Sequence, residues 1–522
     1  MVHTGGAAVA TASRASSASK QSAAAFGVRS MIRDASGYGS TEERSDRPPT
    51  IEEVVEGIGF GHGQVVTIAV ACGTFFAEGL ELLLLSLLCP SITTEIGDRQ
   101  GHQGVVLITS VIAGALLGHL ISGPFADLGG RPHPIILGYC FVVLFSVVSS
   151  FMNSITAISS LRFFVGVGFG MGQPAAIALQ DEVVPRASRF LVISSCYLSF
   201  CAGACLAVLF VLINHSWLQD IAMTEWRLLL RCAAGPVGVI GLAAIFMLPE
   251  SPSFLSANGD YALARDVLAE LRHQNGQTAR TMEAFTPSND KAQQLASPVS
   301  SAFSRLSEFS RLPQAIVLCM ASLVLNFAVY GSGFAGPRIL QEVLPADSPL
   351  FPPAVVVLIA CLVTGLLVIA NMKWGPCFSA KVGVIVSLVL SLCAAFLFCW
   401  TTDISAGPSG VLRRLMLVPA CIGLCCGPTF GILFLAQASA SCYPSVASAT
   451  GVALSLSVGR LGALAAPIVF SLVTSATNHW ELFFMFMAMA ELGCILIFPL
   501  LATRPVEAAE VARLRTSEDL AI

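Results

Sequence analysis

Charged side chains are scarce in this sequence. Asp, Glu, Lys and Arg make up 11% of its 522 residues, whereas hydrophobic residues make up 55%. Soluble domains carry roughly 25% charged residues, so this chain has too few charges to cover a water-exposed surface. The composition therefore places most of the chain in a lipid bilayer. The formal net charge of −4 gives no sign of a nucleic-acid partner.

The chain also lacks the motifs of an enzyme or an ATP-driven pump. The glycines around "GFGMGQP" (168–174) lie in an apolar helix with no strand before it, so they predict close helix packing rather than nucleotide binding. The 17 cysteines form no Cys-x-x-Cys pair and no Cys/His cluster at metal-ligand spacing. Free thiols that pack between helices explain them best. We therefore expect no catalytic residues, no metal ion and no cofactor.

Twelve apolar stretches are long enough to cross a bilayer as helices. A polar segment divides them six and six, and within it residues 259–276 have the pattern of an amphipathic surface helix. The predicted spans are 65–88, 104–122, 134–152, 160–178, 190–213, 228–248, 315–335, 353–371, 381–400, 412–436, 449–474 and 481–501.

Basic residues are distributed unequally between the two sides of this predicted bundle. If both termini lie on one side, that side collects 20 of the 28 Lys and Arg residues and the other side collects 6. The remaining two, Arg162 and Arg460, fall inside spans. The positive-inside rule then places both termini in the cytosol. The Ala- and Ser-rich tail before residue 50 fits a disordered cytosolic segment, and its basic residues leave a transit peptide open as the alternative.

The two sets of six spans repeat one another. "GFGMGQP" in the fourth span parallels "GLCCGP" (423–428) in the tenth, and "EVVPRASR" (182–189) parallels "SCYPSVAS" (441–448). Related six-helix halves are typical of alternating-access transporters. We predict a monomer with a tail at 1–50, a six-helix half at 51–248, a cytosolic linker at 249–314, a second half at 315–501 and a tail at 502–522.

Several motifs resemble the major facilitator superfamily. "GPFADLGGR" (123–131) resembles the Gly-x-x-x-Asp-x-x-Gly-Arg signature between its second and third helices, and "PESPSFL" (249–255) resembles the Pro-Glu-Ser-Pro-Arg motif of sugar porters and organic-ion transporters. "IEEVVEGIGFGHGQ" (51–64) and "YPSVASATG" (443–451) resemble a narrower branch, that of synaptic-vesicle-2-related proteins, niacin transporters and organic anion and cation transporters. The resemblance covers nearly everything after residue 50. It implies an all-α membrane protein with two pseudo-symmetric halves of six transmembrane helices.

The same resemblance implies a cytosolic gate whose ion pairs hold the cytosolic side shut. In the C-terminal half, Met372 and Pro376 stand where an Asp and an Arg are expected, and Ser441 and Ser448 replace a Glu and an Arg. We therefore expect the charge network to survive in the N-terminal half alone. The gate residues are Gly123, Asp127, Gly130, Arg131, Glu182, Arg189, Pro249 and Glu250.

Two glutamates, Glu78 and Glu81, interrupt the first apolar span. They are three residues apart and so share one helical face. Burial and mutual repulsion favour the protonated form of one carboxyl, which suits proton coupling. The resemblance implies that Glu78 stands where sugar porters keep a proton-coupling acid, paired with an Arg that matches Arg162. The alternative is a permanent structural pair without a role in transport.

Arg460 lies inside the eleventh span, where the resemblance implies that organic-anion carriers keep an Arg. An unpaired guanidinium in a cavity can bind a carboxylate through two hydrogen bonds. The alternative is a gate contact with a helix carbonyl or with Glu81. Asn326 and Tyr330 match a polar patch of the seventh helix that often lines the cavity in this superfamily. His119 and Glu491 are expected to join neighbouring helices.

The sequence thus predicts a secondary active transporter of a small polar organic solute. An organic anion is favoured, with protons coupled through Glu78 or Glu81. The alternatives are a facilitator of sugars or organic cations, and a vesicle-type membrane receptor that does not transport. We expect a multi-pass protein whose partners are the lipid bilayer and a small solute. The plasma membrane is favoured over an organelle or vesicle membrane.

Overall fold

The fold of this chain is built from helices. The computed structural model describes residues 49–96, 103–214, 225–277, 312–343, 353–374, 380–402, 410–442 and 445–500. No strand occurs in these ranges. The long helices are α3 (His62–Ile96), α4 (Gln103–Gly129), α5 (Pro132–Ser149), α6 (Ile155–Val183), α7 (Arg189–Asn214), α8 (Trp226–Met247), α13 (Leu312–Val343), α14 (Pro353–Trp374), α15 (Ala380–Thr402), α16 (Gly410–Cys442), α17 (Ser445–Thr477) and α18 (Glu481–Ile497).

These helices fit the predicted spans and extend past several of them. Ten have a described segment that is long and apolar enough to cross a bilayer; α14 contributes the shorter segment Leu358–Lys373, and α18 is 17 residues long. The helix α3 exceeds the predicted span 65–88 at both ends, because polar residues continue the helix beyond the apolar run. The prediction of an all-α membrane protein is therefore confirmed, and a count of twelve spanning helices is consistent with the described residues.

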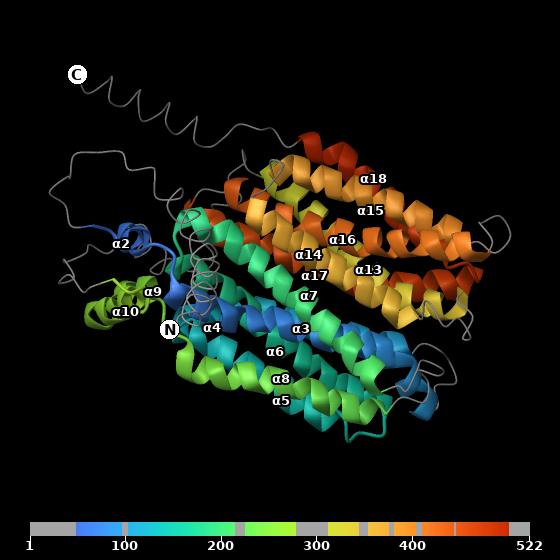
Figure 1. The fold of residues 1–522 in the computed structure, drawn as a ribbon, viewed down its shortest axis with the longest axis horizontal. Helices are drawn as coiled ribbons and strands as arrows, with labels where there is room; N and C mark the ends of the chain where they lie inside the picture. The colour runs from blue at the N-terminus through green and yellow to red at the C-terminus, as the bar shows by residue number, and fades with distance from the viewer. Residues whose placement is uncertain are drawn as a thin grey trace, which may run out of the picture. The chain divides into compact units, whose positions relative to one another are not determined.

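The helices pack in a repeated pattern (Figure 1). In the N-terminal half α3 packs against α7 and α5 against α6; in the C-terminal half α13 packs against α17 and α15 against α16. Between the halves, α7 contacts α14 and α4 contacts α17. Each of these contacts has its counterpart under exchange of the halves, as expected of an internal repeat.

Glycines bring α4 and α6 unusually close together. A Cβ atom added to Gly114 would lie 1.9 Å from the backbone oxygen of Phe163, and one added to Gly166 would lie 2.0 Å from that of Val111. Both distances are far inside van der Waals contact, so only glycine permits this approach. Small residues of this kind let helices associate tightly within a bilayer.

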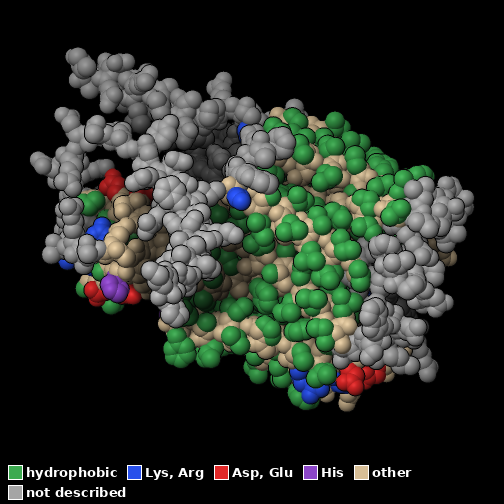
Figure 2. Space-filling model, in the orientation of Figure 1, with side chains coloured by type: hydrophobic (Ala, Val, Ile, Leu, Met, Phe, Trp, Pro, Cys, Tyr) green, Lys and Arg blue, Asp and Glu red, His purple; other side chains and the backbone are tan. Residues whose placement is uncertain are grey.

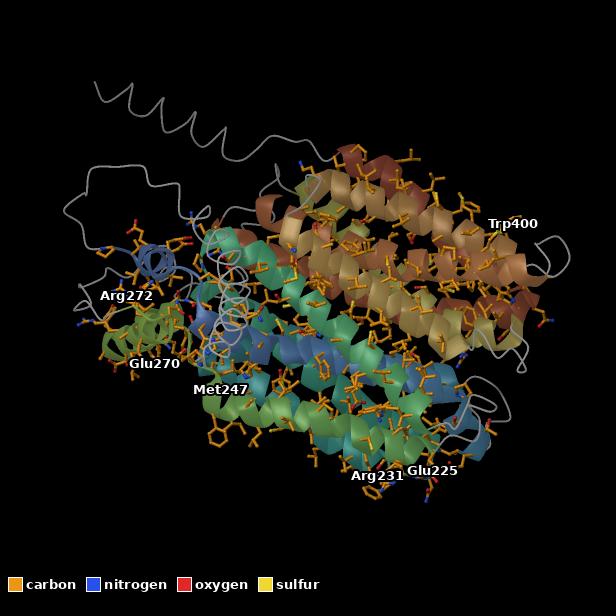
Figure 3. The ribbon with its side chains drawn as sticks, in the orientation of Figure 1. Glu225, Arg231, Met247, Glu270, Arg272 and Trp400 are labelled. Carbon is orange, nitrogen blue, oxygen red and sulfur yellow. The ribbon has the colours of Figure 1, made fainter. Side chains whose placement is uncertain are left out.

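Hydrophobic side chains cover the flank of the helical bundle seen in Figure 2, and nearly all visible charges gather at its ends. The helix α8 illustrates this division. Its outward side chains are apolar: Val239 is 70% exposed and Phe246 is 79% exposed. Figure 3 places Glu225 and Arg231 near one end of this helix and Met247 at the other. A surface of this kind suits contact with lipid acyl chains.

Three short helices lie at the predicted cytosolic end (Figure 1): α2 (Ile51–Ile58), α9 (Pro252–Ala257) and α10 (Tyr261–Gln274). Thr50 caps α2, since its hydroxyl accepts from the Glu53 backbone N–H while the Glu53 carboxylate accepts from the Thr50 N–H at 2.8 Å. The apolar face of α2 packs on Leu268 of α10. The surface helix predicted at 259–276 is confirmed as α10.

Candidate functional site

The two glutamates of α3 are both buried, yet they have different partners. Glu78 is 2% exposed and receives hydrogen bonds at both carboxylate oxygens. Arg460 donates through Nη1 to Oε1 and through Nη2 to Oε2, the latter at 3.1 Å. Tyr330 Oη donates to Oε1 and Gln173 Nε2 to Oε2, each at 2.5 Å. The fork of Arg460 is therefore filled by the chain's own carboxylate.

The Glu78 cluster draws on both halves of the molecule. Glu78 and Gln173 come from α3 and α6 in the N-terminal half, and Tyr330 and Arg460 come from α13 and α17 in the C-terminal half. Arg460 also donates to the amide oxygen of Gln173 at 2.8 Å and to the Tyr330 hydroxyl. Removing one partner of a buried pair leaves an uncompensated charge, which is strongly unfavourable.

The second glutamate, Glu81, belongs to a cluster within one half. Its Oε2 lies 2.5 Å from Nη1 of Arg162 on α6, and its Oε1 accepts from the Ser146 hydroxyl of α5 at 2.8 Å. Arg162 is fully buried, and its Nε and Nη2 have no hydrogen-bond partner in the described part of the structure. This arrangement ties together three helices of the N-terminal half.

Two predictions about these charges are wrong. Glu78 does not pair with Arg162, which pairs with Glu81. Because α3 and α6 run antiparallel, the glutamate farther along α3 faces the earlier part of α6, where Arg162 lies. Arg460 is not unpaired either, and its carboxylate partner is Glu78 rather than Glu81. The spacing of the glutamates predicted that they share one face of α3. It did not predict which residue of the neighbouring helices lies opposite each of them.

Of the two candidates on α13, the structure brings Tyr330 into the Glu78 cluster. Asn326 instead donates to the carbonyl of Ser322, one turn earlier in its own helix, at 2.8 Å. It lies beside Gly459 of α17, where an added Cβ atom would be 2.5 Å from its Nδ2. Asn326 thus supports the helix that carries Arg460 without contacting Glu78 in the described contacts.

Sequence reasoning missed Gln173. Its signal was available: an amide side chain within the apolar fourth span, directly before Pro174. His119 of α4 also interacts with this amide, and its ring nitrogen Nδ1 lies 2.6 Å from the backbone oxygen of Ala115. The hydrogen bond to Ala115 stays within α4, so a role of His119 in joining neighbouring helices stays a prediction.

The gate residues form contacts around the α4–α5 turn. Arg131 Nη2 lies 3.3 Å from Oε1 of Glu182, and the Arg131 backbone N–H donates to Oε1 of Glu250 at 2.9 Å. Gly130 has a φ of +91°, and a Cβ atom there would lie 2.0 Å from Oε2 of Glu250. A side chain at this position would be strained and would displace that carboxylate.

These contacts lie within the N-terminal half and the first residues of the linker that follows it. Gly123 is an exposed residue of α4, and Pro249 precedes Glu250 after the end of α8. The side chains of Asp127, Ser441 and Ser448 and the whole of Pro376 lie outside the described residues. The closing of the cytosolic side by this network stays a prediction.

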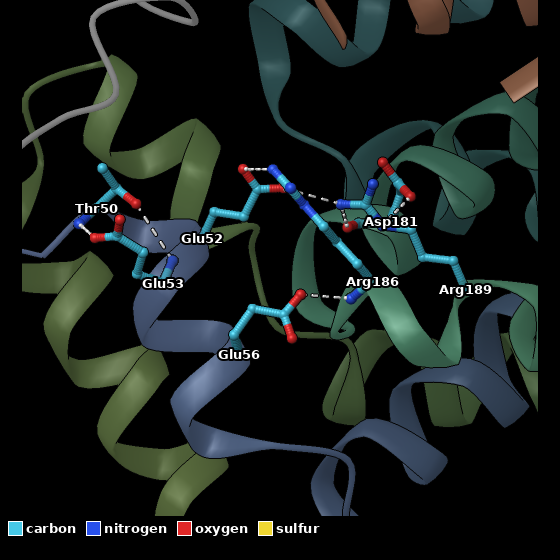
Figure 4. Close-up of polar contacts among 7 residues, drawn as sticks. All are labelled: Thr50, Glu52, Glu53, Glu56, Asp181, Arg186 and Arg189. Carbon is cyan, nitrogen blue, oxygen red and sulfur yellow. Dashed lines mark hydrogen bonds and ion pairs between the residues drawn. The ribbon is translucent and has the colours of Figure 1, made fainter. Parts of the chain in front are cut away.

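Arg189 has acidic neighbours other than Glu182 (Figure 4). Its Nε lies 2.8 Å from Oδ1 of Asp181, and its Nη2 lies 3.3 Å from Oε1 of Glu52. Arg186 pairs with Glu52 at 2.8 Å, and its backbone N–H donates to Glu56 at 2.7 Å. The acidic face of α2 is thereby fastened to the turn between α6 and α7, a contact that the acidic "IEEVVE" run could have indicated.

A cavity of about 140 Å³ lies between the halves beside Tyr330. Its wall combines residues of α3, α4 and α7 with residues of α13, α14, α15 and α16. Tyr330 is therefore shared: its ring side lines the cavity, while its hydroxyl bonds Glu78 and Arg460. Tyr330 thus connects the charged cluster to the cavity.

Comparisons with known proteins agree with this architecture. A family model described as "Sugar (and other) transporter" matches residues 91–510. The SVOPL protein of Mus musculus is 23% identical over 458 residues, which cover 84% of this chain and 88% of that protein. The 4-hydroxybenzoate transporter PcaK of Pseudomonas aeruginosa is 25% identical over 406 residues, 74% of this chain and 81% of PcaK.

A solved structure shows the same fold. The proton:xylose symporter XylE, a major facilitator superfamily protein, superposes with a TM-score of 0.62 at 15% sequence identity. The match covers 83% of this chain and 94% of XylE. At this identity the likeness concerns the arrangement of helices.

Proposed function

The chain belongs to the sugar (and other) transporter family of the major facilitator superfamily, and we propose that it is a secondary active transporter coupling a small organic anion to protons. As a member of this family it is a multi-pass membrane protein and a transporter of small solutes rather than an enzyme. The nature of the solute and the coupling to protons are the proposed part.

The observation that carries the proposal is the pairing of Glu78 with Arg460 between the halves. A guanidinium fork suits a planar carboxylate, and the Glu78 carboxylate occupies it in this structure. A proton on Glu78 removes the negative charge that holds the fork. Arg460 is then available to the carboxylate of a substrate.

Charge balance makes the two ligands dependent on each other. With Glu78 ionised and Arg460 charged, the cluster is neutral. Adding only a proton leaves one positive charge, and adding only an anion leaves one negative charge, in a buried site where an uncompensated charge is costly. Adding both restores neutrality. Transport of an anion together with a proton is the result.

The exchange of Arg460 from Glu78 to the substrate also links proton binding to the relative movement of the two halves. The pair ties α3 of one half to α17 of the other. In the proposed cycle the halves change their relative position in the two neutral states, empty and fully loaded. Glu81 remains paired with Arg162 throughout, because all partners of that cluster belong to one half.

One relative supports the choice of an anion. PcaK is named as a transporter of 4-hydroxybenzoate, which is a carboxylate, and it is similar to this chain over 74% of the sequence.

Uptake by the purified protein in liposomes tests the proposal. With the proton concentration higher outside, labelled small carboxylates should accumulate, and a protonophore should abolish that accumulation. Accumulation confined to uncharged or cationic solutes would contradict the anion assignment. Carboxylate binding without uptake would instead indicate a receptor.

A further inference from the structure

The wall of the cavity beside Tyr330 is short of hydrogen-bonding groups. Among the described residues that line it there is no Asp, Glu, Lys, Arg, His, Asn or Gln. Most of the wall is aliphatic or aromatic, including the rings of Phe200, Phe334 and Phe398. Sites that bind polar solutes rely on a few well-placed polar groups, and this wall supplies almost none.

The few hydroxyl groups in the wall already donate hydrogen bonds within the protein. Each of the four Ser and Thr hydroxyls donates to a backbone carbonyl of its own helix, at distances of 2.6 to 3.1 Å. Tyr330 donates to Glu78. The remaining donors are thiols, which are weak. The four hydroxyl residues are Ser86, Ser332, Thr364 and Thr429.

A solute with many hydroxyl groups would therefore lose its hydrogen bonds to water on entering. Its oxygens would find only weak thiol donors in the described wall, and a buried polar group without a good partner is unfavourable. An apolar group suffers no such loss and gains contact with the aromatic rings.

The cavity has room for one small ring. Its volume of about 140 Å³ is close to that of an apolar protein cavity of roughly 150 Å³ that binds benzene. One six-membered ring fills such a space.

We infer that this cavity holds the apolar ring of the transported anion, so that the substrate class is carboxylates carrying a single apolar ring. The inference rests on the proposed function, because the carboxylate is assigned to Arg460. Tyr330 joins the two parts of the site, with its ring beside the apolar wall and its hydroxyl at the charged cluster.

Three carboxylates test the inference: benzoate, cyclohexanecarboxylate and glucuronate. All three carry one carboxylate on a six-membered ring, and they differ in the polarity of that ring. In proteoliposomes with an imposed pH gradient, benzoate and cyclohexanecarboxylate should accumulate faster than in protein-free liposomes, into which their neutral acid forms diffuse unaided, and this passive rate is subtracted. Glucuronate should have a kcat/KM lower by at least about tenfold, since its hydroxyls meet no donors.

A pair of variants at Leu83 checks that the wall causes the preference. Leu83 is a half-buried wall residue of α3. Leu83→Gln adds an amide to the wall and should lower the ratio of kcat/KM for benzoate to kcat/KM for glucuronate. Leu83→Met keeps the volume and polarity, and it should leave the ratio unchanged. An identical ratio in both variants would contradict the assignment of the wall.

The outcomes separate this inference from the proposed function. If glucuronate is transported with the same kcat/KM as benzoate, the inference of an apolar ring is wrong and the proposed transport of an anion stands. Accumulation of uncharged benzamide, with all three carboxylates excluded, would overturn the carboxylate of the proposed function while keeping the apolar ring. If no compound of the set is transported or raises the thermal unfolding temperature of the purified protein, both are wrong.

Discussion

Glu78 and Glu81 are the same residue type, one helical turn apart and equally buried, but their partners differ. Glu78 binds Arg460 and Tyr330 of the other half; Glu81 binds Arg162 and Ser146 of its own half. A pair within one half moves as a unit with that half. A pair between halves links two bodies that move relative to each other. In the proposed cycle it is therefore the location of the partner, rather than the carboxylate itself, that distinguishes Glu78 from Glu81.

Replacing Glu78 gives the largest expected effect. Glu78→Gln imitates the protonated carboxyl and leaves nothing to titrate. Accumulation driven by a pH gradient should fall to the level of empty liposomes, while exchange of substrate across the membrane continues. Counterflow and gradient-driven uptake, measured on the same vesicles, check this. Concentrative uptake equal to that of the parent would mean that proton coupling lies elsewhere.

The other side of this pair can be weakened while its charge is kept. Arg460→Lys retains the charge but loses the planar fork. Its KM for a carboxylate should rise by about tenfold or more, because a bidentate contact becomes a single one. Saturation kinetics of uptake check this. An unchanged KM would remove Arg460 from the substrate site and would leave its pairing with Glu78 as a structural contact.

Glu81 provides the matched control for Glu78. Glu81→Gln leaves Arg162 buried without a carboxylate, so the free energy of unfolding should fall by about 3–5 kcal/mol. The protein that does fold should still accumulate substrate against its gradient. Thermal unfolding together with uptake normalised to folded protein separates the two effects. Loss of gradient coupling in folded Glu81→Gln would erase the distinction between the glutamates.

Arg131, at the turn on the predicted cytosolic side, should show the smallest effect on binding. Arg131→Ala removes the contact with Glu182 but lies away from the Glu78 cluster. The turnover rate should drop several-fold while the binding constant for substrate stays the same. Comparing kcat with equilibrium binding checks this. Weaker binding with a normal turnover rate would contradict the gate assignment.

The sequence indicated most of the fold, and the reason is physical. Apolar runs of sufficient length must form helices in a bilayer, since each backbone polar group has to be paired within its own segment. The same rule made Glu78, Glu81, Arg162 and Arg460 conspicuous. The motifs at 123–131 and 249–255 then supplied the order of the helices through their resemblance to a known superfamily.

The pairing of the charges did not follow from the sequence. It depends on how far each helix is shifted along its axis relative to its neighbours, and residue spacing within one helix carries no information about that shift. Gln173 and Tyr330 complete the Glu78 cluster for the same reason: the packing of four helices brings them together. The low polarity of the cavity wall also emerged only once residues of seven helices were placed around one space.

The balance of one acid against one base in the Glu78 cluster has an energetic consequence for the cell. A carrier that crosses the membrane with one net charge gains or loses about 2.3 kcal/mol for every 100 mV of membrane potential. In the proposed cycle neither the empty nor the loaded cluster carries net charge, so the potential does no work on the carrier. For an anion, this removes the opposition of a negative interior. Accumulation is then set by acidity alone, at about tenfold for each unit of pH difference.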